Sequence, residues 1–400
     1  MSDTPAATAR LYYDDSFLLD FDAVVAGHGR FGGRDSVVLD RSAFYPESGG
    51  QLADVGLLGD LAVRDVQIDE RDVVHHLLDE GAPLPPIGTP LRGRIDRSRR
   101  RLHMALHTGQ HMLSRALLDE ARAETVSSRL GATACTIDVN VAQLDEADAA
   151  RAEALVNSIV EDDRAVRAWF PSGDELKGLP LRRAPKVTEN IRVVDVGGFD
   201  VSPCGGTHCA RTAQVGGVSI TGVERYKGKI RVTFLAGRSA WSELTARSRA
   251  LVELARSFTC GPLDTRAGVE RLRADLQTAR ESLGVARGQW AALYARALLD
   301  EARAKGETRV VCELSGDMAD MTRALASHLT AAPGVVAMLA SRTPEGLQVM
   351  IARAEESSFD CGAWLKRAVQ AHGGRGGGRA ERAEGRLPPT ADWALVAREP

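Results

Sequence analysis

The stretches HTGQH, residues 107–111, and CGGTH, residues 204–208, decide how this chain must fold. In both stretches the first and last residues are four positions apart, and on a helix that spacing puts two side chains on one face, one turn apart. The two stretches are distant in the sequence, so only a folded domain can bring them together. Small zinc fingers, whose ligand pairs are closer along the chain, do not fit this separation.

The end residues of these stretches form a candidate set of metal ligands. The imidazoles of His107, His111 and His208 and the thiolate of Cys204 make a nitrogen and sulfur set that suits Zn²⁺. We therefore expect one Zn²⁺ ion per chain, acting as a Lewis acid or as the source of a bound hydroxide. A single pair of this kind more often reflects packing or chance. Two pairs together, with glycines that let the backbone approach a ligand closely, favour a metal site.

The composition is that of an ordinary folded protein. Among 400 residues, 44% are hydrophobic and 26% are charged, and this length predicts two to four domains. The net charge of -3 gives no global signal for nucleic acid, and the basic runs are local. Six scattered cysteines show no disulfide pattern, which favours a reduced, cytoplasmic compartment. The N-terminus lacks the apolar segment of a secretory signal, and no run approaches the length of a membrane span.

The first region of the chain, to about residue 95, has the pattern of a β domain. Short apolar runs alternate with glycine- and proline-containing turns, which predicts a small barrel or a folded sheet. Within it, residues 44–51 read FYPESGGQ. This stretch is either a plain turn or a glycine-rich loop that contacts the backbone of a substrate.

After Asp96 helices mix with strands. Apolar residues at helical spacing predict a helix that carries His107 and His111, and residues 146–163 predict a second, acidic helix. Strands are expected at residues 132–142 and 191–196, the latter leading toward Cys204, and a hairpin turns at residues 227–229. This order is typical of an α+β domain.

The remaining chain is expected to be helical and then α/β. From residue 242 to 305, apolar residues recur in steps of three and four, which indicates either a helix packed on its own domain or an arm or dimer seam. We favour an arm because arginine and glutamate occupy the outer positions. Three strands follow, with a final strand expected at residues 393–396. The intervening GGRGGGR, residues 373–379, is either a flexible linker or a backbone nest with arginines for phosphate.

Three motifs carry a family resemblance. FYPESGGQ, HTGQH and CGGTH, in this order and at these separations, resemble the editing domain of alanyl-tRNA synthetase and its free-standing relatives, the AlaX proteins. LYYDDS, residues 11–16, is similar to the start of an AlaX protein, and GGRGGGR resembles the signature of the DHH-associated domain that ends alanyl-tRNA synthetase. The resemblance covers nearly the whole chain, and the long AlaX type describes it best. No room for a class II aminoacylation domain is expected ahead of residue 11.

The resemblance implies an α+β fold in four parts. They are an N-terminal β-barrel domain at residues 1–95, a zinc-dependent editing domain at 96–241, a helical arm at 242–305, and an α/β DHH-associated-type tRNA-binding domain at 306–400. The catalytic motifs of DHH phosphoesterases are not evident, so the last part is expected only to bind. A homodimer through the arm or the last part is a further expectation.

The implied enzyme is an aminoacyl-tRNA deacylase. Its partner is mischarged tRNA(Ala), chiefly carrying serine, with glycine as the second candidate; ATP binding is a further term used for the family. The metal motif falls on His107, His111, Cys204 and His208. Catalytic roles are expected for His107, His111, Cys204, Gln110 and Thr207, and tRNA contacts for Gly49, Gly50, Gln51, Gly374, Arg375, Gly376, Gly377, Gly378 and Arg379.

Recognition of serine needs a polar contact, because a pocket that admits serine cannot exclude the smaller alanine by size. Thr108, Gln110, Ser128 and Thr207 are candidates for bonding the serine hydroxyl, and ordinary capping or loop bonding is the alternative for each. In related editing domains a threonine often precedes the second metal histidine, where this chain has Gln110. We expect His208 to be the most dispensable ligand because it lies last in a glycine-containing loop.

Three other functions compete with this reading. A zinc peptidase or amidase is disfavoured, because HTGQH lacks the glutamate of the H-E-x-x-H helix that serves as general base. A tRNA-binding protein with a structural zinc remains open. Editing of a different aminoacyl-tRNA also remains open, since threonine-type editing domains use similar metal motifs.

Overall fold

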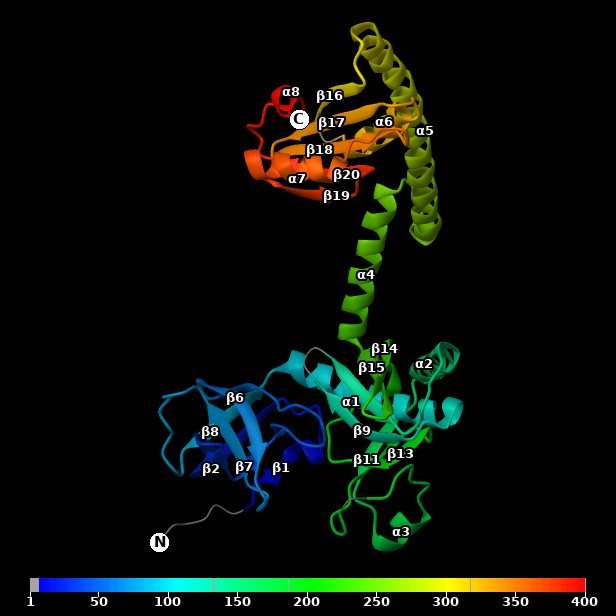
Figure 1. Cartoon of the computed structure of the whole chain (residues 1–400). Helices are drawn as coiled ribbons and strands as arrows, with labels where there is room; N and C mark the ends of the chain where they lie inside the picture. The colour runs from blue at the N-terminus through cyan, green and yellow to red at the C-terminus, as the bar shows by residue number, and fades with distance from the viewer. Residues whose placement is uncertain (1–6, 132–133, 186, 317, 400) are drawn as a thin grey trace. The chain divides into compact units, whose positions relative to one another are not determined.

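The computed structural model describes residues 7–131, 134–185, 187–316 and 318–399, which fold into two compact units, residues 1–251 and 252–400 (Figure 1). Each unit has hydrophobic cores of its own. Both units mix helices with sheets, and the expected α+β class is confirmed. Among the described residues, no helix has the length and apolar character needed to cross a lipid bilayer.

The first unit begins with a six-stranded barrel. The strands close in the order β2-β3-β7-β6-β5-β8. Over the first eight residues of the longest of them every second residue is buried, so one face of the strand fills the barrel. The barrel strands are β2 (Asp20–Phe31), β3 (Arg34–Leu39), β5 (Gly56–Leu58), β6 (Leu61–Ile68), β7 (Val74–Leu78) and β8 (Pro90–Ile95). A short turn, η1 (Leu11–Tyr13), and a pair of two-residue strands, β1 (Ala9–Arg10) and β4 (Arg41–Ser42), lie beside it.

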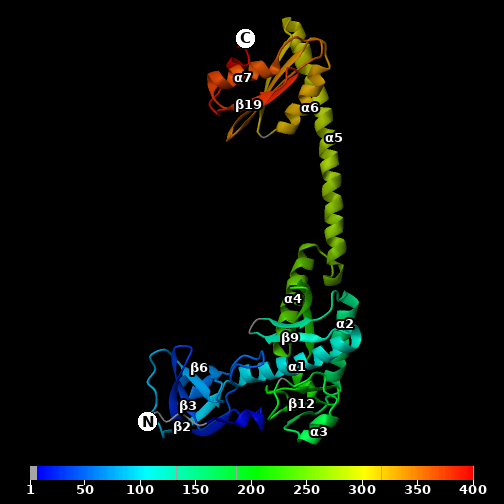
Figure 2. The ribbon, with the colours of Figure 1, turned by 60° about the horizontal axis from the view of Figure 1, so that its bottom comes forward.

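Helix α1 (Arg97–Ala121) follows the barrel and is the centre of the first unit (Figures 1 and 2). Asp96 caps it by accepting a hydrogen bond from the backbone N–H of Arg99, and Arg122 ends it in the left-handed conformation. A buried ion pair between Arg100 and Asp54 fixes its first turn to the barrel. Its middle, from His103 to Ser114, is buried on every side, so any polar side chain there must find a partner.

Two sheets and a second helix enclose α1. It contacts α2 (Glu146–Glu161) and the antiparallel sheet β14-β15-β10-β9. The strands of that sheet are β9 (Thr125–Leu130), β10 (Cys135–Val139), β14 (Val218–Tyr226) and β15 (Lys229–Ala236). A smaller antiparallel sheet contains β11 (Val166–Trp169), β12 (Val193–Val196) and β13 (Asp200–Pro203), with α3 (Gly173–Gly178) after its first strand and η2 (Thr212–Val215) after its last. Strand β13 leads directly into the CGGTH stretch.

The expected helical region consists of two helices. They are α4 (Arg238–Ser257) and α5 (Thr265–Lys305), separated by residues 258–264 and the short turn η3 (Pro262–Asp264). Thr259 has a φ of 52° in this break, and Pro262 cannot donate a backbone hydrogen bond, so a single helix from 242 to 305 is excluded.

The second unit contains a five-stranded sheet in the order β16-β17-β18-β20-β19 (Figure 1). Only the pair β16-β17 is parallel. The strands are β16 (Arg309–Ser315), β17 (Val336–Thr343), β18 (Gly346–Arg353), β19 (Arg375–Gly378) and β20 (Arg382–Leu387), and the helices are α6 (Ala319–Thr330), α7 (Cys361–His372) and α8 (Trp393–Val396).

Two expectations for this unit are wrong. Residues 393–396 form the short helix α8, because Asp392 caps it and Trp393 and Val396 are buried on one face. The glycine-rich stretch is neither a flexible linker nor a nest, since its central residues form the edge strand β19, paired antiparallel with β20. A Cβ at Gly378 would lie 2.3 Å from the carbonyl oxygen of Arg382, so a close approach of two strands requires this glycine.

Candidate metal centre

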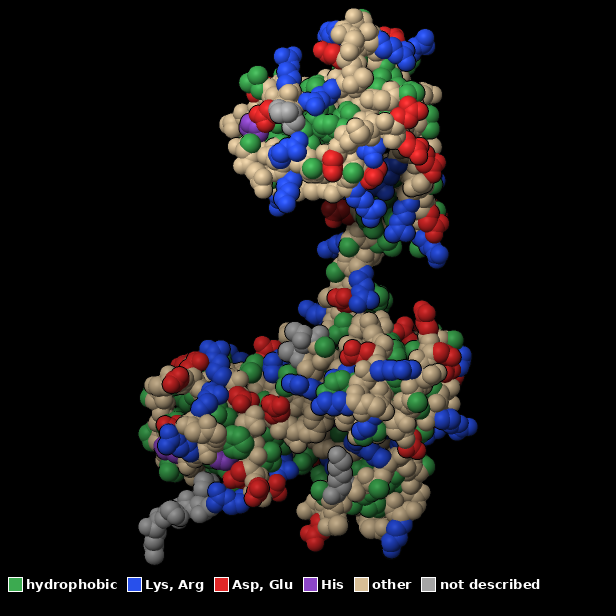
Figure 3. Space-filling model, in the orientation of Figure 1, with side chains coloured by type: hydrophobic (Ala, Val, Ile, Leu, Met, Phe, Trp, Pro, Cys, Tyr) green, Lys and Arg blue, Asp and Glu red, His purple; other side chains and the backbone are tan. Residues whose placement is uncertain are grey.

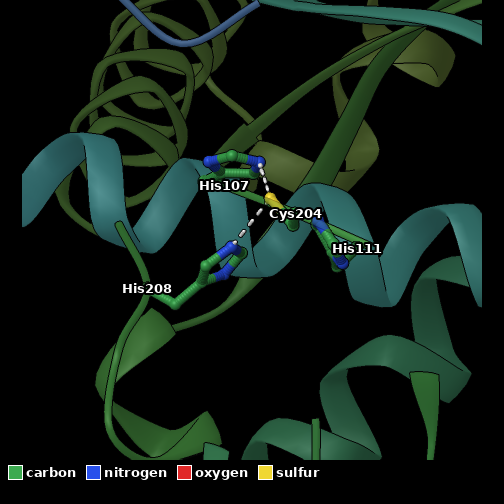
Figure 4. A group of neighbouring side chains, drawn as sticks. All are labelled: His107, His111, Cys204 and His208. Atoms are coloured by element: carbon green, nitrogen blue, oxygen red, sulfur yellow. Dashed lines mark hydrogen bonds between the residues drawn. The ribbon is translucent and has the colours of Figure 1, made fainter. Parts of the chain in front are cut away.

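The two motif stretches meet inside the first unit (Figure 4). His107 and His111 lie one turn apart on α1, and Cys204 and His208 come from the loop that follows β13. The four ligand atoms all lie within 4.8 Å of one another. The Sγ atom of Cys204 is 3.3 Å from Nε2 of His107 and 3.3 Å from Nε2 of His208. The same i, i+4 spacing therefore brings two ligands together in two different ways. His107 and His111 are joined by a helical turn, and Cys204 and His208 by an irregular loop.

Gln51 orients the ring of His107. The Nδ1–H of His107 donates to Oε1 of Gln51 at 2.7 Å, and the amide nitrogen of Gln51 donates to the hydroxyl of Thr207 at 2.9 Å. This second bond fixes which way the amide points. The bond to Nδ1 leaves the lone pair of Nε2 directed at Cys204, which is the arrangement a metal-ligating histidine needs.

Asp200 orients the ring of His111. Oδ2 of Asp200 accepts from Nδ1 of His111 at 2.9 Å and from the hydroxyl of Ser202 at 2.9 Å. Arg182 forms an ion pair with the same carboxylate. Burial alone would raise the pKa of Asp200, but the bonds from His111 and Arg182 outweigh it and hold that pKa well below its usual range. Asp200 is therefore placed as a carboxylate behind an imidazole of the candidate metal site, an arrangement common around metal ligands.

Thr108 orients the ring of His208. The hydroxyl of Thr108 lies 3.2 Å from Nδ1 of His208 and accepts from the backbone N–H of Cys209 at 3.0 Å. His208 is buried, and its surroundings lower its pKa to about 3, through burial first and the nearby His107 second. His208 is thus a neutral, fixed imidazole. That His208 is the most dispensable ligand stays a prediction.

The charge state of Cys204 suits a metal ligand. Burial alone would raise the pKa of its thiol, but the imidazoles of His107, His208 and His111 outweigh it and hold the pKa well below its ordinary value. The backbone N–H of Gly206 donates to the sulfur at 3.4 Å. A thiolate is the form that binds zinc.

The cluster fits a zinc ion. Nε2 of His111 is buried and has no hydrogen-bond partner among the described residues, although such atoms are normally satisfied. Each of the three imidazoles has its Nδ1 occupied by an oxygen and its Nε2 available. Three nitrogens and one sulfur match the preferences of Zn²⁺. A Cβ at Gly206 would lie 2.1 Å from the His107 ring, so the second glycine of CGGTH lets that ring approach the loop.

A cavity of about 720 Å³ opens onto the cluster. Of the four ligands, His107 and Cys204 line it, and His111 and His208 do not. Its volume is that of a small-molecule site. The other polar side chains in its wall belong to Arg10, Tyr12, Tyr13, Tyr45, Ser48, Asp72, Gln110, Ser127, Ser128, Arg183, Glu189, Asn190 and Arg192.

The polar residues chosen from sequence occupy different places. Gln110 and Ser128 line the cavity, and the amide nitrogen of Gln110 donates to Ser114 at 2.8 Å. Thr207 and Thr108 are fully buried and bond to Gln51 and His208 instead of facing the cavity. Both threonines therefore position other residues.

The glycine-rich loop lies partly in the cavity wall. Gly49 and Gly50 line the cavity, and both have positive φ angles, which glycine adopts readily. The side chain of Gln51 is fully buried against His107 and is not available to contact tRNA. The C-terminal candidates Arg375 and Gly376 line a separate cavity of about 460 Å³ in the second unit, while Gly374, Gly377, Gly378 and Arg379 are exposed.

Sequence reasoning missed two residues of the site. Asp200 lies four positions before Cys204, and a carboxylate so close to a metal motif is a usable signal for a histidine partner. Arg192 donates to the carbonyl oxygens of Cys204 at 3.1 Å and Gly206 at 2.8 Å and so holds the ligand loop. Nothing in the sequence around Arg192 indicates this role.

These features define a domain with a nitrogen and sulfur centre suited to a metal ion. Residues 191–233 match the family model described as the threonyl and alanyl tRNA synthetase second additional domain. The matched segment contains β12, β13, the CGGTH loop, and most of the β14–β15 hairpin. It supplies Cys204 and His208 but not the two histidines of α1.

The chain is homologous to alanyl-tRNA synthetases over nearly its whole length. The alanine–tRNA ligase of Pyrococcus furiosus is 30% identical over 392 residues, covering 95% of this chain and 42% of the ligase. That of Archaeoglobus fulgidus is 32% identical over 405 residues, covering 96% and 43%. That of Halobacterium salinarum is 32% identical over 371 residues, covering 88% and 39%. The resemblance expected from the motifs is confirmed, and the chain spans less than half the length of these relatives.

Among solved structures, the C-Ala domain of Aquifex aeolicus alanyl-tRNA synthetase matches 22% of this chain and 84% of that domain. The identity is 20% and the TM-score is 0.21, a likeness too low to establish a shared fold.

Proposed function

We propose that this chain is a trans-editing deacylase, which hydrolyses the ester of mischarged tRNA(Ala), chiefly seryl-tRNA(Ala), with glycyl-tRNA(Ala) as the second candidate. One observation carries the proposal: four side chains suited to Zn²⁺ converge beside a cavity that two of them line, in a chain homologous to alanyl-tRNA synthetases. An aminoacyl ester is already activated, so its hydrolysis needs a placed water and a stabilised oxyanion.

The residues of the chain have distinct parts in this chemistry. When bound, a Zn²⁺ ion supplies a Lewis acid that polarises a carbonyl or lowers the pKa of water from 15.7 to about 7. His107 and Cys204 line the cavity and would present the bound ion to the substrate. His111 and His208 do not line the cavity and would complete the coordination of the ion. Gln51, Asp200 and Thr108 fix the imidazole rings, which keeps the ligands in place without reorganisation.

Gln110 is our candidate for the residue that hydrogen-bonds the hydroxyl of the serine substrate. Its amide nitrogen is occupied by Ser114, whose own hydroxyl also accepts from Thr125 at 2.8 Å. The amide oxygen of Gln110 has no hydrogen-bond partner among the described residues and belongs to a side chain in the cavity wall. A site that hydrogen-bonds a substrate hydroxyl can reject the analogue without it by about 10⁴–10⁵. This mechanism would spare alanyl-tRNA(Ala), and it would likewise disfavour glycyl-tRNA(Ala), which also lacks the hydroxyl.

The four-part division of the chain is part of the proposal. Residues 1–95 and 96–241 would form the deacylase, with Gly49 and Gly50 at the cavity contacting the tRNA end. Residues 242–305 would connect it to the C-terminal tRNA-binding part, where Arg375 and Arg379 are exposed. A DHH-associated character of residues 306–400 rests on the resemblance of the glycine-rich stretch.

A structural zinc in a tRNA-binding protein is the second candidate. Four protein ligands make a closed site, and closed sites are typical of structural zinc. In that case the cavity would bind the tRNA end without hydrolysing it.

One assay separates the two functions. Seryl-tRNA(Ala) and alanyl-tRNA(Ala) are incubated with the zinc-loaded chain and with Cys204→Ala, and ester loss is followed over time. Fast loss of serine with alanine spared, absent in the variant, supports the deacylase. Binding of both tRNAs without ester loss would leave the structural alternative.

A further inference from the structure

An aromatic pair lies beside the cavity. Phe170 follows β11 directly, and its side chain is 47% exposed. Its ring contacts the ring of Tyr13 edge to face, with centroids 5.6 Å apart. Tyr13 lines the cavity, and Phe170 lies beyond the cavity lining, as an exposed neighbour of the Tyr13 ring. The two residues come from distant parts of the sequence, so the fold brings two aromatic rings together at this point. Neither ring belongs to a hydrophobic core of the first unit.

Tyr13 is held in place by its neighbours. Its hydroxyl accepts a hydrogen bond from Arg10 at 2.9 Å, and the guanidinium carbon of Arg192 lies 5.3 Å from the centre of its ring. The ring of Tyr12 packs edge to face against it at 4.8 Å. These contacts leave Tyr13 few alternative positions, so Phe170 rests on a fixed support.

The adjoining wall carries three arginines. Arg10, Arg183 and Arg192 line the cavity, together with the acids Asp72 and Glu189. Asp72 is paired with Arg10. The Cys204 thiolate is a third anion in this wall, so its charges balance until a divalent metal adds positive charge. The arginines lie next to the aromatic surface.

Arg192 forms no ion pair with a carboxylate among the described residues. It is buried, its donors reach only backbone carbonyl oxygens, and its Nε has no hydrogen-bond partner there. A buried guanidinium with an unused donor at a cavity wall favours an anionic ligand.

We propose that the outer part of the cavity is a nucleotide subsite: Phe170, supported by Tyr13, stacks on a terminal base of single-stranded RNA, and the arginine wall meets its phosphate. Single-stranded ends are bound by stacking on aromatic side chains next to positive charge. The inference rests on the proposed function, since a base held there would direct the 3′ ester toward His107 and Cys204.

Binding of the trinucleotide CCA, the 3′ end of tRNA, tests the subsite without requiring hydrolysis. Calorimetry on the zinc-loaded full chain compares wild type with Phe170→Leu and Phe170→Trp. Loss of base stacking costs about tenfold in affinity, so Phe170→Leu should bind CCA about tenfold more weakly and Phe170→Trp should bind as wild type does. Val223→Ala, at another exposed apolar side chain of the first unit, is the control and should change nothing.

Unchanged CCA binding in Phe170→Leu, or equal loss in both Phe170 variants, would overturn the inference. Since Phe170 is exposed, its variants are expected to fold, and circular dichroism checks this. CCA binding that depends on Phe170 in a chain without deacylase activity would support the subsite and reject the proposed function. Deacylation with a KM unaffected by Phe170→Leu would support the proposed function and reject the subsite.

Discussion

The metal centre and the glycine-rich edge strand were both predicted from sequence motifs, but the two motifs act in opposite ways in the structure. At the centre, the side chains of HTGQH and CGGTH supply the four candidate metal ligands, and three of the four are buried. In β19 the glycines matter because they lack side chains, and the arginines between and beside them are exposed. The face drawn in Figure 3 carries positive and negative side chains interspersed, so exposed arginines alone do not indicate a site. The difference teaches that a motif of ligand types constrains geometry more than a motif of small residues does.

The largest effect is expected for Cys204→Ala. Removing the only sulfur ligand leaves three imidazoles, so we expect loss of bound zinc and a fall in seryl-tRNA(Ala) deacylation of more than about 100-fold. Zinc content by mass spectrometry and the deacylation rate are measured together. Cys209→Ala is the matched control: this neighbouring buried thiol bonds through its backbone to Thr108 and should keep the metal. Equal zinc content in the two variants would contradict the assignment of Cys204 as a zinc ligand.

Asp200→Asn should have the next largest effect. The amide keeps the size of the carboxylate but loses the charge that fixes the His111 ring, and such changes cost about 10–100-fold in metal affinity. Competition with a zinc chelator measures the affinity. Excess zinc should restore deacylation, which a mere folding defect would not allow. Asp195→Asn, in β12, keeps an acceptor for the Gly198 turn and is expected to bind zinc normally.

Gly378→Ala tests the packing of the glycine-rich strand β19 in the second unit. The added Cβ would lie 2.3–2.4 Å from the backbone of Arg382 and Ala383, so we expect the second unit to lose about 1–3 kcal/mol of unfolding free energy. Gly377→Ala, with nothing within 4 Å of the added atom, should be nearly neutral. Denaturant unfolding gives both values, and zinc content should not change. Equal stability of the two variants would contradict the packing role of these glycines.

The smallest effect is expected for the double change Arg375→Gln and Arg379→Gln. If both contact tRNA phosphates, binding weakens and the slope of log affinity against log salt falls by up to about two. Filter binding across a salt series measures it. Arg266→Gln, at an exposed arginine paired with Glu270, is the control. An unchanged slope would mean that Arg375 and Arg379 do not contact tRNA phosphates and that β19 is only a structural edge strand.

The sequence predicted those parts of the site that depend on local spacing. His107 and His111 lie on one helix face because 3.6 residues make a turn, and the apolar residues around them indicated a buried helix. Most strands were found from alternation and turns. These features need no knowledge of distant contacts.

Partners supplied by distant segments could not be predicted. Gln51 reaches His107 from the barrel domain, and Arg192 holds the loop of Cys204 from the preceding strand region. The misread strand at residues 393–396 shows the same limit, because four apolar residues have no clear period and the helix depends on the Asp392 cap and on burial of Trp393. Glycine-rich residues 373–379 were ambiguous because glycine permits most backbone conformations.

The most direct test of the account is a zinc titration of the metal-free full chain, with the deacylation rate of seryl-tRNA(Ala) measured at each step. The account predicts a rate that rises in proportion to added zinc and levels off at one ion per chain. Full activity of the metal-free chain, or one bound zinc without any deacylation, would contradict it.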